Sequence, residues 1–259
     1  MELLNTILAA DEGNPVAVER PEGRSPILLI CEHASKLIPR SLGDLGLSEE
    51  LRSSHIAWDP GALDVSLFLS DELDACLIHQ RFSRLAYDCN RPPEAESAIP
   101  KRSEIFEIPG NVAANAEEKQ ARVDGIYRPF QAAVAQEIAR RKAAGKPTVL
   151  VTLHSFTPIF KGMRRETEIG ILHDSDSRFA DKVISSLGRG SSFVVQRNDP
   201  YGPEDGVTHT LIEHGVRNGL QNVMVEVRND LFTDETSRER VEQHLLRAFV
   251  ESLGSEEIF

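Results

Sequence analysis

The chain has 259 residues, of which 40% are hydrophobic and 27% are charged, and its formal net charge is -12. This length is enough for one large α/β domain or two small ones, and the apolar content is ordinary for a globular protein with a sizeable core. The acidic balance argues against nucleic-acid binding, which needs a basic surface.

The sequence also argues against a membrane or secreted protein. No apolar run reaches the roughly 18 residues that a membrane-spanning helix needs, and the N-terminus lacks the basic segment that opens a signal peptide. The three cysteines, Cys31, Cys76 and Cys89, are odd in number and lack CxxC spacing, so we expect buried thiols rather than disulfides. We therefore predict a cytoplasmic protein with neither nucleic acid nor membrane as a partner. Its oligomeric state does not follow from the sequence.

Glycines and prolines separate a short lead-in from one longer domain. Pro15, Pro21 and two glycines interrupt any periodic pattern in residues 1–25, which we expect to be a loosely held segment. No later stretch is rich enough in glycine, proline or serine to act as a linker. Residues 26–259 are therefore predicted to form a single domain.

Within this domain, hydrophobic runs alternate with segments of helical periodicity. Strands are expected at residues 26–31, 76–79, 148–154, 168–173, 192–196 and 223–227, and a further strand is expected to start at Arg84. Helices are expected at residues 48–51, 62–73, 113–144 with an interruption near Pro129, 177–187, 208–219 and 233–252. Strands that alternate with helices at this spacing predict an α/β fold with three layers, α/β/α, around a mixed, mostly parallel sheet.

Two of the predicted strands lead to a histidine. The run from Ile27 leads to His33, and the run from Thr148 leads to His154. Ligands of open α/β sheets bind beyond the carboxyl ends of the strands, and two neutral imidazoles with one oxygen ligand are typical of a catalytic zinc site. The alternative is that each histidine only hydrogen-bonds to a core carbonyl. Because both have polar neighbours at a strand end, the pair favours one zinc ion.

The oxygen ligand of this site has two candidates. Asp59 lies in Trp58-Asp59-Pro60-Gly61, where a helix is predicted to begin, and its carboxylate could equally cap that helix. Glu32 is adjacent to His33, and neighbouring residues of an extended strand point to opposite faces. A loop conformation would remove that objection, so Asp59 is preferred and Glu32 remains open.

Glu226 lies inside the apolar strand predicted at residues 223–227. A carboxylate in such a place is either paired with a cation or active in catalysis. Beside a metal ion it can take a proton from water and pass it to a leaving nitrogen. The alternative is an ion pair with Arg228 or Arg84. Residues 226 and 228 share a face of the strand, so the two interpretations are compatible.

Asn90 and Arg91 precede two prolines, which restrict the backbone that leaves them. A guanidinium holds a carboxylate through two parallel hydrogen bonds, which makes Arg91 a candidate clamp for an acidic substrate. The alternative is a solvated arginine on a loop.

Several segments of the chain combine into a family pattern. They are Cys31-Glu-His-Ala-Ser35 with Ile38-Pro39, His55-Ile-Ala-Trp-Asp-Pro-Gly-Ala62, Ser83-Arg-Leu-Ala-Tyr-Asp-Cys-Asn-Arg91, Leu153-His-Ser-Phe156, Asn198-Asp-Pro-Tyr201 with Gly206-Val-Thr-His209, and Val225-Glu-Val-Arg-Asn-Asp230. Together these motifs resemble those of the N-formylglutamate amidohydrolase family, from about residue 26 to about residue 232. The combination is specific for the family, although no single motif is.

That family is similar in fold to zinc carboxypeptidases and aminoacylases, so the resemblance implies a zinc-exopeptidase-like fold. His154-Ser-Phe resembles their second histidine motif, Asp88-Cys-Asn-Arg91 their substrate-carboxylate motif, and Val225-Glu-Val-Arg the segment with their general base. The sequence departs at the first metal motif, where those enzymes have a glutamate three residues after the histidine and this chain has Lys36. The departure leaves Asp59 or Glu32 to supply the oxygen ligand.

The resemblance implies a metal-dependent amidohydrolase that cleaves the N-formyl or N-acyl bond of an acidic amino acid such as N-formylglutamate. It places zinc on His33, Asp59 and His154, proton transfer on Glu226, and substrate binding on Asn90, Arg91, Arg84, Ser155 and Tyr201. A dianionic substrate needs a second cation besides Arg91, for which Arg84 and Arg164 are the candidates. Two alternatives stay open: a zinc amidase or peptidase acting on another acylated amino acid or peptide-like substrate, and a metal-free binding protein that retains the pocket.

Overall fold

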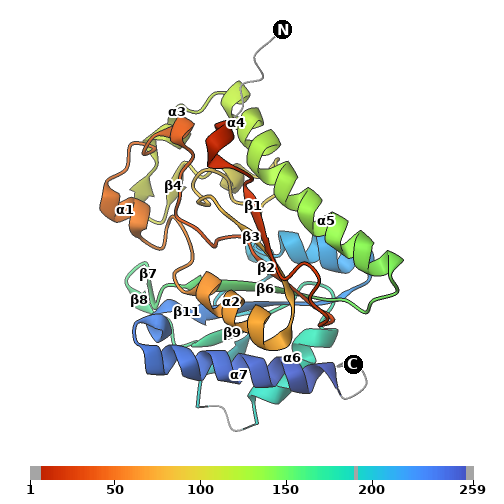
Figure 1. Cartoon of the computed structure of the whole chain (residues 1–259). Coiled ribbons are helices and arrows are strands. Elements are labelled where there is room, and N and C mark those ends of the chain that lie inside the picture. Colours follow the sequence, from red (N-terminus) through yellow and green to blue (C-terminus); the bar gives the residue numbers. More distant parts are fainter. Residues whose placement is uncertain (1–6, 190–191, 255–259) are drawn as a thin grey trace.

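A computed structural model describes residues 7–189 and 192–254. Seven strands form one sheet, in the spatial order β1 (Val16–Glu19), β3 (Cys76–Gln80), β2 (Ile27–Cys31), β6 (Val149–Phe156), β11 (Gln221–Arg228), β9 (Ile169–Leu172) and β10 (Val195–Arg197) (Figure 1). Strands β3, β2, β6 and β11 are parallel, as are β9 and β10. Within this sheet, as far as the described residues show, the pairs β1 with β3 and β11 with β9 are antiparallel. The short pairs β4 (Arg102–Ser103) with β5 (Phe106–Glu107) and β7 (Ile159–Phe160) with β8 (Met163–Arg164) form two separate antiparallel hairpins. The predicted mixed, mostly parallel sheet is confirmed.

Helices cover the sheet on both sides, with α2 (Ala62–Leu73), α6 (Arg178–Leu187) and α7 (Glu235–Leu253) on one face and α5 (Arg128–Ala143) on the other. The shorter helices are α1 (Glu49–Ser53), α3 (Pro109–Ala113) and α4 (Ala116–Arg122). A π-helical segment, Val123–Tyr127, joins α4 to α5 at the predicted interruption, and Pro129 lies in the first turn of α5. The helix expected at residues 208–219 is a short π-helix, Leu211–Gly215, followed by the 3-10 turn Val216–Asn218.

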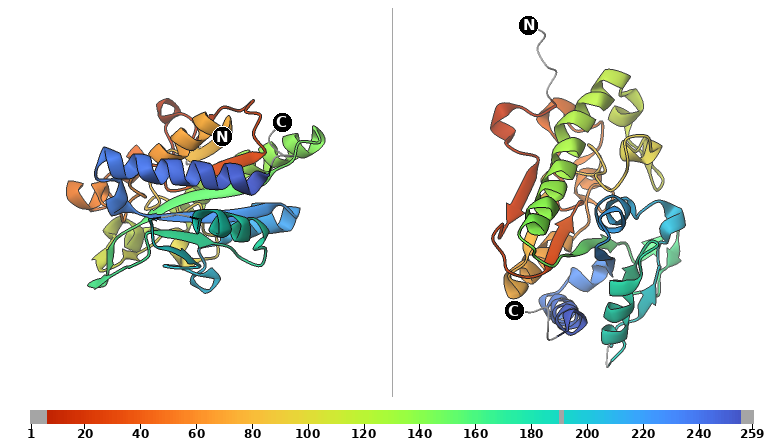
Figure 2. Two further views of the ribbon diagram at one scale, coloured as in Figure 1. Left: turned by 90° about the horizontal axis from the view of Figure 1, so that it is seen from below. Right: turned by 90° about the vertical axis from the view of Figure 1, so that its right-hand side faces the viewer.

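Alternate residues of the central strands face different helical layers. In β2, Ile27 and Leu29 pack with α2, α6 and α7, whereas Leu28 and Ile30 pack with α5 on the opposite face. The two views of Figure 2 show α7 on one side of the sheet and α5 on the other. Since side chains alternate along a strand, this two-sided burial explains why the central strands read as continuous apolar runs.

Two helix starts follow from capping residues in the sequence. Ser48 accepts a hydrogen bond from the amide of Leu51 at the start of α1, and Asp234 accepts one from the amide of Ser237 at the start of α7. Each side chain satisfies an amide that has no partner within its helix. Ser48 and Asp234 therefore cap these two helices.

Part of the predicted lead-in belongs to the sheet. Residues 16–19 form β1, which pairs with β3 along four residues. The run Val-Ala-Val-Glu is too short, and too close to Pro15, to stand out by periodicity. Residues 1–6 of the lead-in lie outside the described residues. The division into a lead-in and a single domain over residues 26–259 stays a prediction.

The segment from Arg84 forms turns instead of the expected strand. The amide of Ala86 donates to the carbonyl of Ser83, and the amide of Arg91 donates to the carbonyl of Asp88. These local hydrogen bonds replace the ladder that a strand would need. The turns bring Arg84 and Asp88 to one side of the segment, where their side chains form an ion pair.

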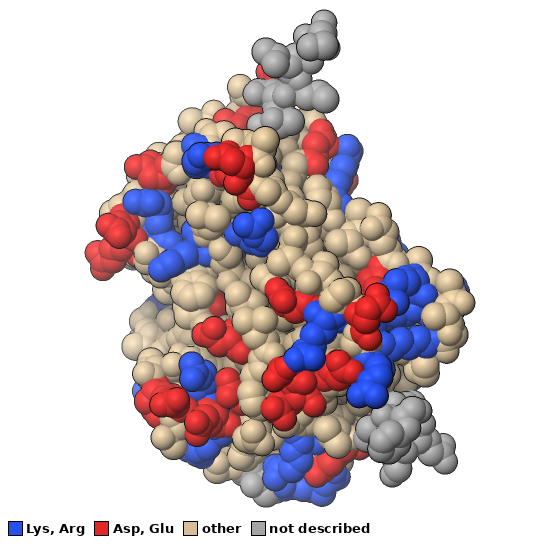
Figure 3. Space-filling view, viewed as in Figure 1, with Lys and Arg blue, Asp and Glu red and all other residues tan. Residues whose placement is uncertain are grey.

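Three further features of the structure concern its helices, its cysteines and its surface charge. Within the described residues, no helix is both long and apolar enough to cross a membrane. Cys31, Cys76 and Cys89 are all buried free thiols, as expected. Acidic and basic side chains are interspersed on the face that Figure 3 shows.

Candidate metal centre and substrate cavity

Three side chains from distant parts of the chain converge at the carboxyl ends of β2 and β6. His33 lies two residues beyond β2, Asp59 precedes α2, and His154 lies within β6. The Nδ1 atoms of the two histidines are 3.2 Å apart, and Asp59 Oδ2 lies 3.1 Å from Nδ1 of His33 and 3.0 Å from Nδ1 of His154. All three side chains are buried. They form a compact triangle of possible metal ligands.

The triangle fits a divalent metal ion. Zinc binds imidazole nitrogen and carboxylate oxygen at about 2.0–2.2 Å in a tetrahedron, so its ligand atoms lie about 3.3 Å from one another. The three separations in this group are close to that value. Three protein ligands also leave the fourth position open, which is the pattern of a catalytic rather than a structural zinc site.

A second ring of carboxylates orients the two imidazoles. Nε2 of His33 lies 2.7 Å from Asp88 Oδ1, and Nε2 of His154 lies 3.2 Å from Glu32 Oε2. The hydrogen bond to Asp88 holds a proton on Nε2 of His33 and leaves the lone pair of its Nδ1 directed at the centre of the triangle, as in the carboxylate–histidine pairs around many metals. The charge of Glu32 favours the same arrangement for His154. Glu32 thus lies behind His154, and the geometry favours Asp59 as the oxygen ligand.

Asp59 does not cap α2. The N-cap residue of that helix is Gly61, whose positive φ of 80° suits glycine, and only the backbone carbonyl of Asp59 bonds to the helix, at the amide of Ala62. The Asp59 carboxylate instead faces the histidines and accepts the amide of Ser155 at 3.3 Å. The alternative of a simple helix cap is therefore wrong.

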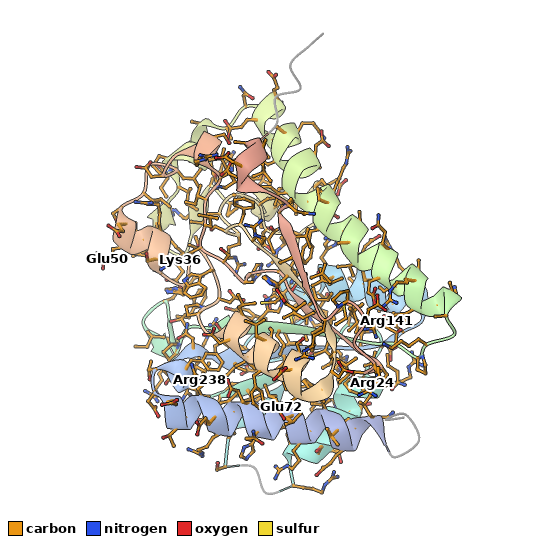
Figure 4. The ribbon with its side chains drawn as sticks, viewed as in Figure 1. Arg24, Lys36, Glu50, Glu72, Arg141 and Arg238 are labelled. Atoms are coloured by element: carbon orange, nitrogen blue, oxygen red, sulfur yellow. The ribbon has the colours of Figure 1, made fainter. Side chains whose placement is uncertain are left out.

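Lys36 takes no part in the triangle. Its ammonium lies 5.6 Å from the centre of the Trp58 ring, and Figure 4 shows it on the side of the molecule where α1 lies. The side chain three residues after His33 thus lies outside the ligand group. Asp59 instead reaches the group from the segment before α2.

Arg84 joins the two aspartates instead of standing free in a pocket. Its guanidinium lies 3.3 Å from Asp59 Oδ1 and 2.8 Å from Asp88 Oδ2. Both carboxylates also face His33, so Arg84 fixes the two acids that orient one ligand. The geometry favours this supporting role over the substrate contact that we expected.

The charges of the group are strongly coupled. Although burial opposes it, His33 and the nearby Arg84 hold the pKa of Asp59 below its usual range. Burial also lowers the pKa of His154, but Glu32 and Asp59 outweigh it and raise that pKa well above 6.5. For His33, burial and Arg84 are outweighed by Asp88 and Asp59, and the pKa is again raised. The acids are therefore ionised, and without a metal the imidazoles favour a proton.

Replacing Asp88 by asparagine should weaken metal binding by about 10- to 100-fold, since the negative charge that holds the proton on Nε2 of His33 and makes the ring a stronger ligand is lost. Competition with a chromophoric chelator measures this affinity directly. Asp181→Asn, which removes an exposed ion pair with Arg197, is the control and should leave the affinity unchanged. Equal affinities for the Asp88 variant and the wild-type protein would contradict the orienting role.

Glu226 lies directly beside the ligand triangle. It pairs with His154 across the parallel strands β11 and β6, and residues paired in this way project to the same face. Its side chain is buried, and Oε2 has no hydrogen-bond partner among the described residues. Burial raises the pKa of Glu226 to about 7, against the opposing charge of His154. This is a suitable value for a group that accepts and returns a proton near neutral pH.

The ion pair considered for Glu226 does not form. Arg228 instead contacts Asp230 at 2.8 Å and Glu168 at 3.2 Å. Arg84 is held by Asp59 and Asp88. A carboxylate that is buried without a cation is costly in free energy, which is more typical of a working group than of a structural one.

Two of the expected substrate contacts are occupied by the protein itself. The side-chain amide of Asn90 donates to the carbonyl of Val207 at 2.6 Å, and its oxygen accepts the amide of Thr210 at 3.0 Å. The Ser155 hydroxyl donates to the carbonyl of Pro60 at 2.8 Å. Asn90 therefore fastens the 207–210 loop and Ser155 fastens the start of α2, so both favour roles in holding the site together.

Arg91 and Tyr201 do face open space. Both line a cavity of about 680 Å³, together with Arg164 and Arg165. Burial raises the pKa of the Tyr201 phenol, and the charge on Glu226 adds to this. The cavity lies beside the end of β6, because the Arg165 guanidinium on its wall is 5.4 Å from the ring centre of Phe156. It extends to the β7–β8 hairpin, in which β7 (Ile159–Phe160) pairs with β8 (Met163–Arg164).

A glycine lets the loop with Tyr201 approach the sheet. Gly170 of β9 pairs with Glu226 of β11, and a Cβ atom added to it would lie 2.2 Å from the carbonyl oxygen of Asp199. Any larger residue would push the loop away from β9. The small residue opposite Glu226 thus keeps Tyr201 near the site.

The sequence did not identify the contacts of Asp88 and Arg165. Asp88 was visible only as part of the motif that ends at Arg91, and its contact with His33 joins residues 55 positions apart. Arg165 follows an exposed hairpin, and its pattern is that of an ordinary loop arginine. Only the folded chain brings Asp88 next to His33 and places Arg165 on the wall of the cavity.

Comparisons with known proteins agree with the motif pattern. The sequence model of the N-formylglutamate amidohydrolase family matches residues 25–233. Among solved structures, gene product Atu2144 from Agrobacterium tumefaciens is similar, with 51% identity, a TM-score of 0.94, and coverage of 97% of this chain and 99% of that chain. N-formylglutamate amidohydrolase from Ralstonia eutropha JMP134 is 20% identical, with a TM-score of 0.63 and coverage of 92% and 98%. This second likeness shows the fold alone. A comparison with curated proteins found no match.

Proposed function

The chain belongs to the N-formylglutamate amidohydrolase family, and we propose that it is a zinc-dependent amidohydrolase of N-formyl or other N-acyl acidic amino acids such as N-formylglutamate. The observation that carries this proposal is the buried triangle of His33, Asp59 and His154 with the unpaired carboxylate of Glu226 beside it. Two imidazoles and one carboxylate with an open fourth position support zinc over metals that prefer oxygen ligands alone.

Hydrolysis adds one water across the amide bond. The formyl carbon gains the hydroxyl, the C–N bond breaks, and the nitrogen gains the proton, which yields formate and the free amino acid. A zinc ion on His33, Asp59 and His154 would act as a Lewis acid that polarises the carbonyl and makes water more acidic. Glu226 accepts the proton of the attacking water and delivers it to the leaving nitrogen.

Substrate recognition in this proposal rests on the cavity. Arg91 lines it, and a guanidinium binds a carboxylate in two parallel hydrogen bonds. The net charge of -12 is no obstacle, because the cavity is lined by the four cations Arg91, Lys161, Arg164 and Arg165 against the three acids Glu166, Asp199 and Asp205. Tyr201 is proposed as a further contact on its wall.

The location and domain organisation are also proposals. Three buried free thiols support a reducing compartment, of which the cytoplasm is the simplest choice. We take residues 26–259 to be one catalytic domain, supported by a sheet whose strands come from both halves of the chain.

A release assay over a panel of N-formyl and N-acetyl amino acids tests the function. We expect formate release from N-formylglutamate by zinc-loaded protein, loss of activity with a chelator, and recovery with added zinc. Preference for another acylated amino acid or a peptide would instead support the broader amidase. Substrate binding without turnover and without stoichiometric metal would support a binding protein, and would refute our proposal.

A further inference from the structure

The substrate cavity contains four cations that lack acidic partners. They are Arg91, Lys161, Arg164 and Arg165. Glu166, Asp199 and Asp205 also line the cavity, but among the described residues no carboxylate lies within 4.0 Å of any of the four cations. Arg91 and Arg165 each donate to a backbone carbonyl. Arg84, by contrast, is neutralised by two aspartates. The cation that meets a second substrate carboxylate is therefore to be found on the cavity wall and not at Arg84.

Arg165 is the wall cation that the fold holds most firmly. Its guanidinium lies 4.5 Å from the ring centre of Phe160, 4.8 Å from that of Tyr201 and 5.4 Å from that of Phe156. Aromatic rings attract a guanidinium through its charge and leave its N–H groups available to an anion. Arg164 and Lys161 are exposed on the hairpin, and so they are less well fixed in position.

The backbone of Arg165 is fixed as well. Its amide donates to the carbonyl of Pro158 at 2.9 Å, and its carbonyl accepts from the buried guanidinium of Arg228 at 3.1 Å. Arg228 is itself an anchor, since it also binds Glu168 and Asp230. A group that is fixed before the ligand arrives loses less conformational entropy on binding, so Arg165 is suited to selective recognition.

The aromatic neighbours connect Arg165 to the reaction centre. Phe156 lies two residues beyond His154 on the same strand and so projects to the same face of the sheet. Arg91 lies on the segment whose Asp88 contacts His33. The α-carboxylate of the substrate is attached to the same carbon as the scissile nitrogen, so it must stay close to the proposed metal ligands. The side-chain carboxylate lies farther away along the cavity.

We propose that Arg165 determines the specificity for acidic substrates by binding the side-chain carboxylate, while Arg91 binds the α-carboxylate. This inference rests on the proposed function. The tests compare N-formylglutamate with N-formylglutamine, in which a neutral amide replaces that carboxylate. Arg165→Gln should lower kcat/KM for N-formylglutamate by about 10- to 100-fold and for N-formylglutamine by less than about threefold. Arg91→Gln should lower both, because both substrates keep the α-carboxylate.

Two variants control for other effects of the change. Arg165→Lys keeps the charge without the two-pronged geometry and should give a smaller loss than Arg165→Gln. Arg240→Gln removes another arginine that lies over an aromatic ring, 5.1 Å from the centre of Phe193, on the outer helix α7. It should leave the preference between the two substrates unchanged.

A measurement without turnover separates this proposal from the proposed function. Glutarate, which has two carboxylates, should raise the unfolding temperature of the wild-type protein more than butyrate does, and Arg165→Gln should abolish that difference. Equal losses on both substrates, or a glutarate effect that survives in Arg165→Gln, would overturn the role of Arg165. Absence of N-formylglutamate turnover by the wild-type protein would instead overturn the proposed function, while the glutarate test still decides on Arg165.

Discussion

Replacing Glu226 by glutamine is expected to lower kcat by about two to four orders of magnitude while KM changes little. Glutamine has nearly the shape of glutamate but cannot accept a proton, so the packing beside His154 is kept and only the proton transfer is lost. A loss in kcat alone indicates an interaction made in the transition state and not in the bound substrate. Steady-state kinetics on zinc-loaded protein measure both constants.

Glu242→Gln is the matched control for this change. Glu242 is also buried, on α7, and burial also raises its pKa. It therefore reports what the loss of any buried carboxylate does to the protein. We expect kcat close to that of the wild-type enzyme. If Glu226→Gln retained full activity, or if both variants lost activity to the same extent, Glu226 would not be the proton carrier.

The same Glu226 substitution should stabilise the metal-free protein at alkaline pH. A carboxyl group whose pKa rises from 4.5 in the unfolded chain to about 7 in the folded one binds its proton more tightly in the folded state. The resulting destabilisation is absent below pH 4.5, grows as the pH rises, and reaches at most about 3 kcal/mol above pH 7. Thermal unfolding with a chelator should therefore show a gain at pH 8 that disappears near pH 4.5.

The residues at strand ends could be predicted from the sequence. A buried strand is recognised by its apolar run, and the parallel arrangement brings the carboxyl ends of such strands to one edge. His33, His154 and Glu226 were identified in this way, and their convergence follows from the register of β6 with β11 and of β2 with β6. Asp59 could be named only as one of two candidates, because its place depends on how the loop before α2 returns to the sheet.

The supporting contacts could not be predicted, since they depend on turns. The segment from Arg84 was expected to be a strand, which would have pointed successive side chains in opposite directions. In the turns that form instead, Arg84 and Asp88 act together on Asp59 and His33. The role of Asn90 could not be predicted either, because its hydrogen bonds to the 207–210 loop join segments more than a hundred residues apart.

Replacing His154 by alanine is expected to abolish stoichiometric zinc binding and, with it, activity. His154 is one of the three proposed ligands, so its loss should exceed the effect expected for Asp88→Asn, which acts through His33. Metal analysis after dialysis and competition with a chelator measure the change. His244→Ala is the control, because His244 lies on α7, where its ring bonds to the carbonyl of Arg240 and packs edge-on against Phe193, and it is not one of the three residues of the triangle. Zinc retained by the His154 variant at one ion per chain would refute the assignment.

Zinc binding to the wild-type protein should also release protons and grow stronger as the pH rises. The pKa values of His33 and His154 are raised above 6.5, so near neutral pH the metal-free imidazoles favour a proton that a metal must displace. In the metal-free protein, these protonated pairs stabilise the fold below pH 6.5, and this stabilisation is lost as the pH rises through the raised pKa values. The metal reverses the trend, because it binds only the folded, neutral form. The difference in unfolding temperature between zinc-loaded and chelated protein should therefore widen from pH 6 to pH 8. A constant difference, with no proton release in calorimetry across buffers, would show that the histidines are not the ligands.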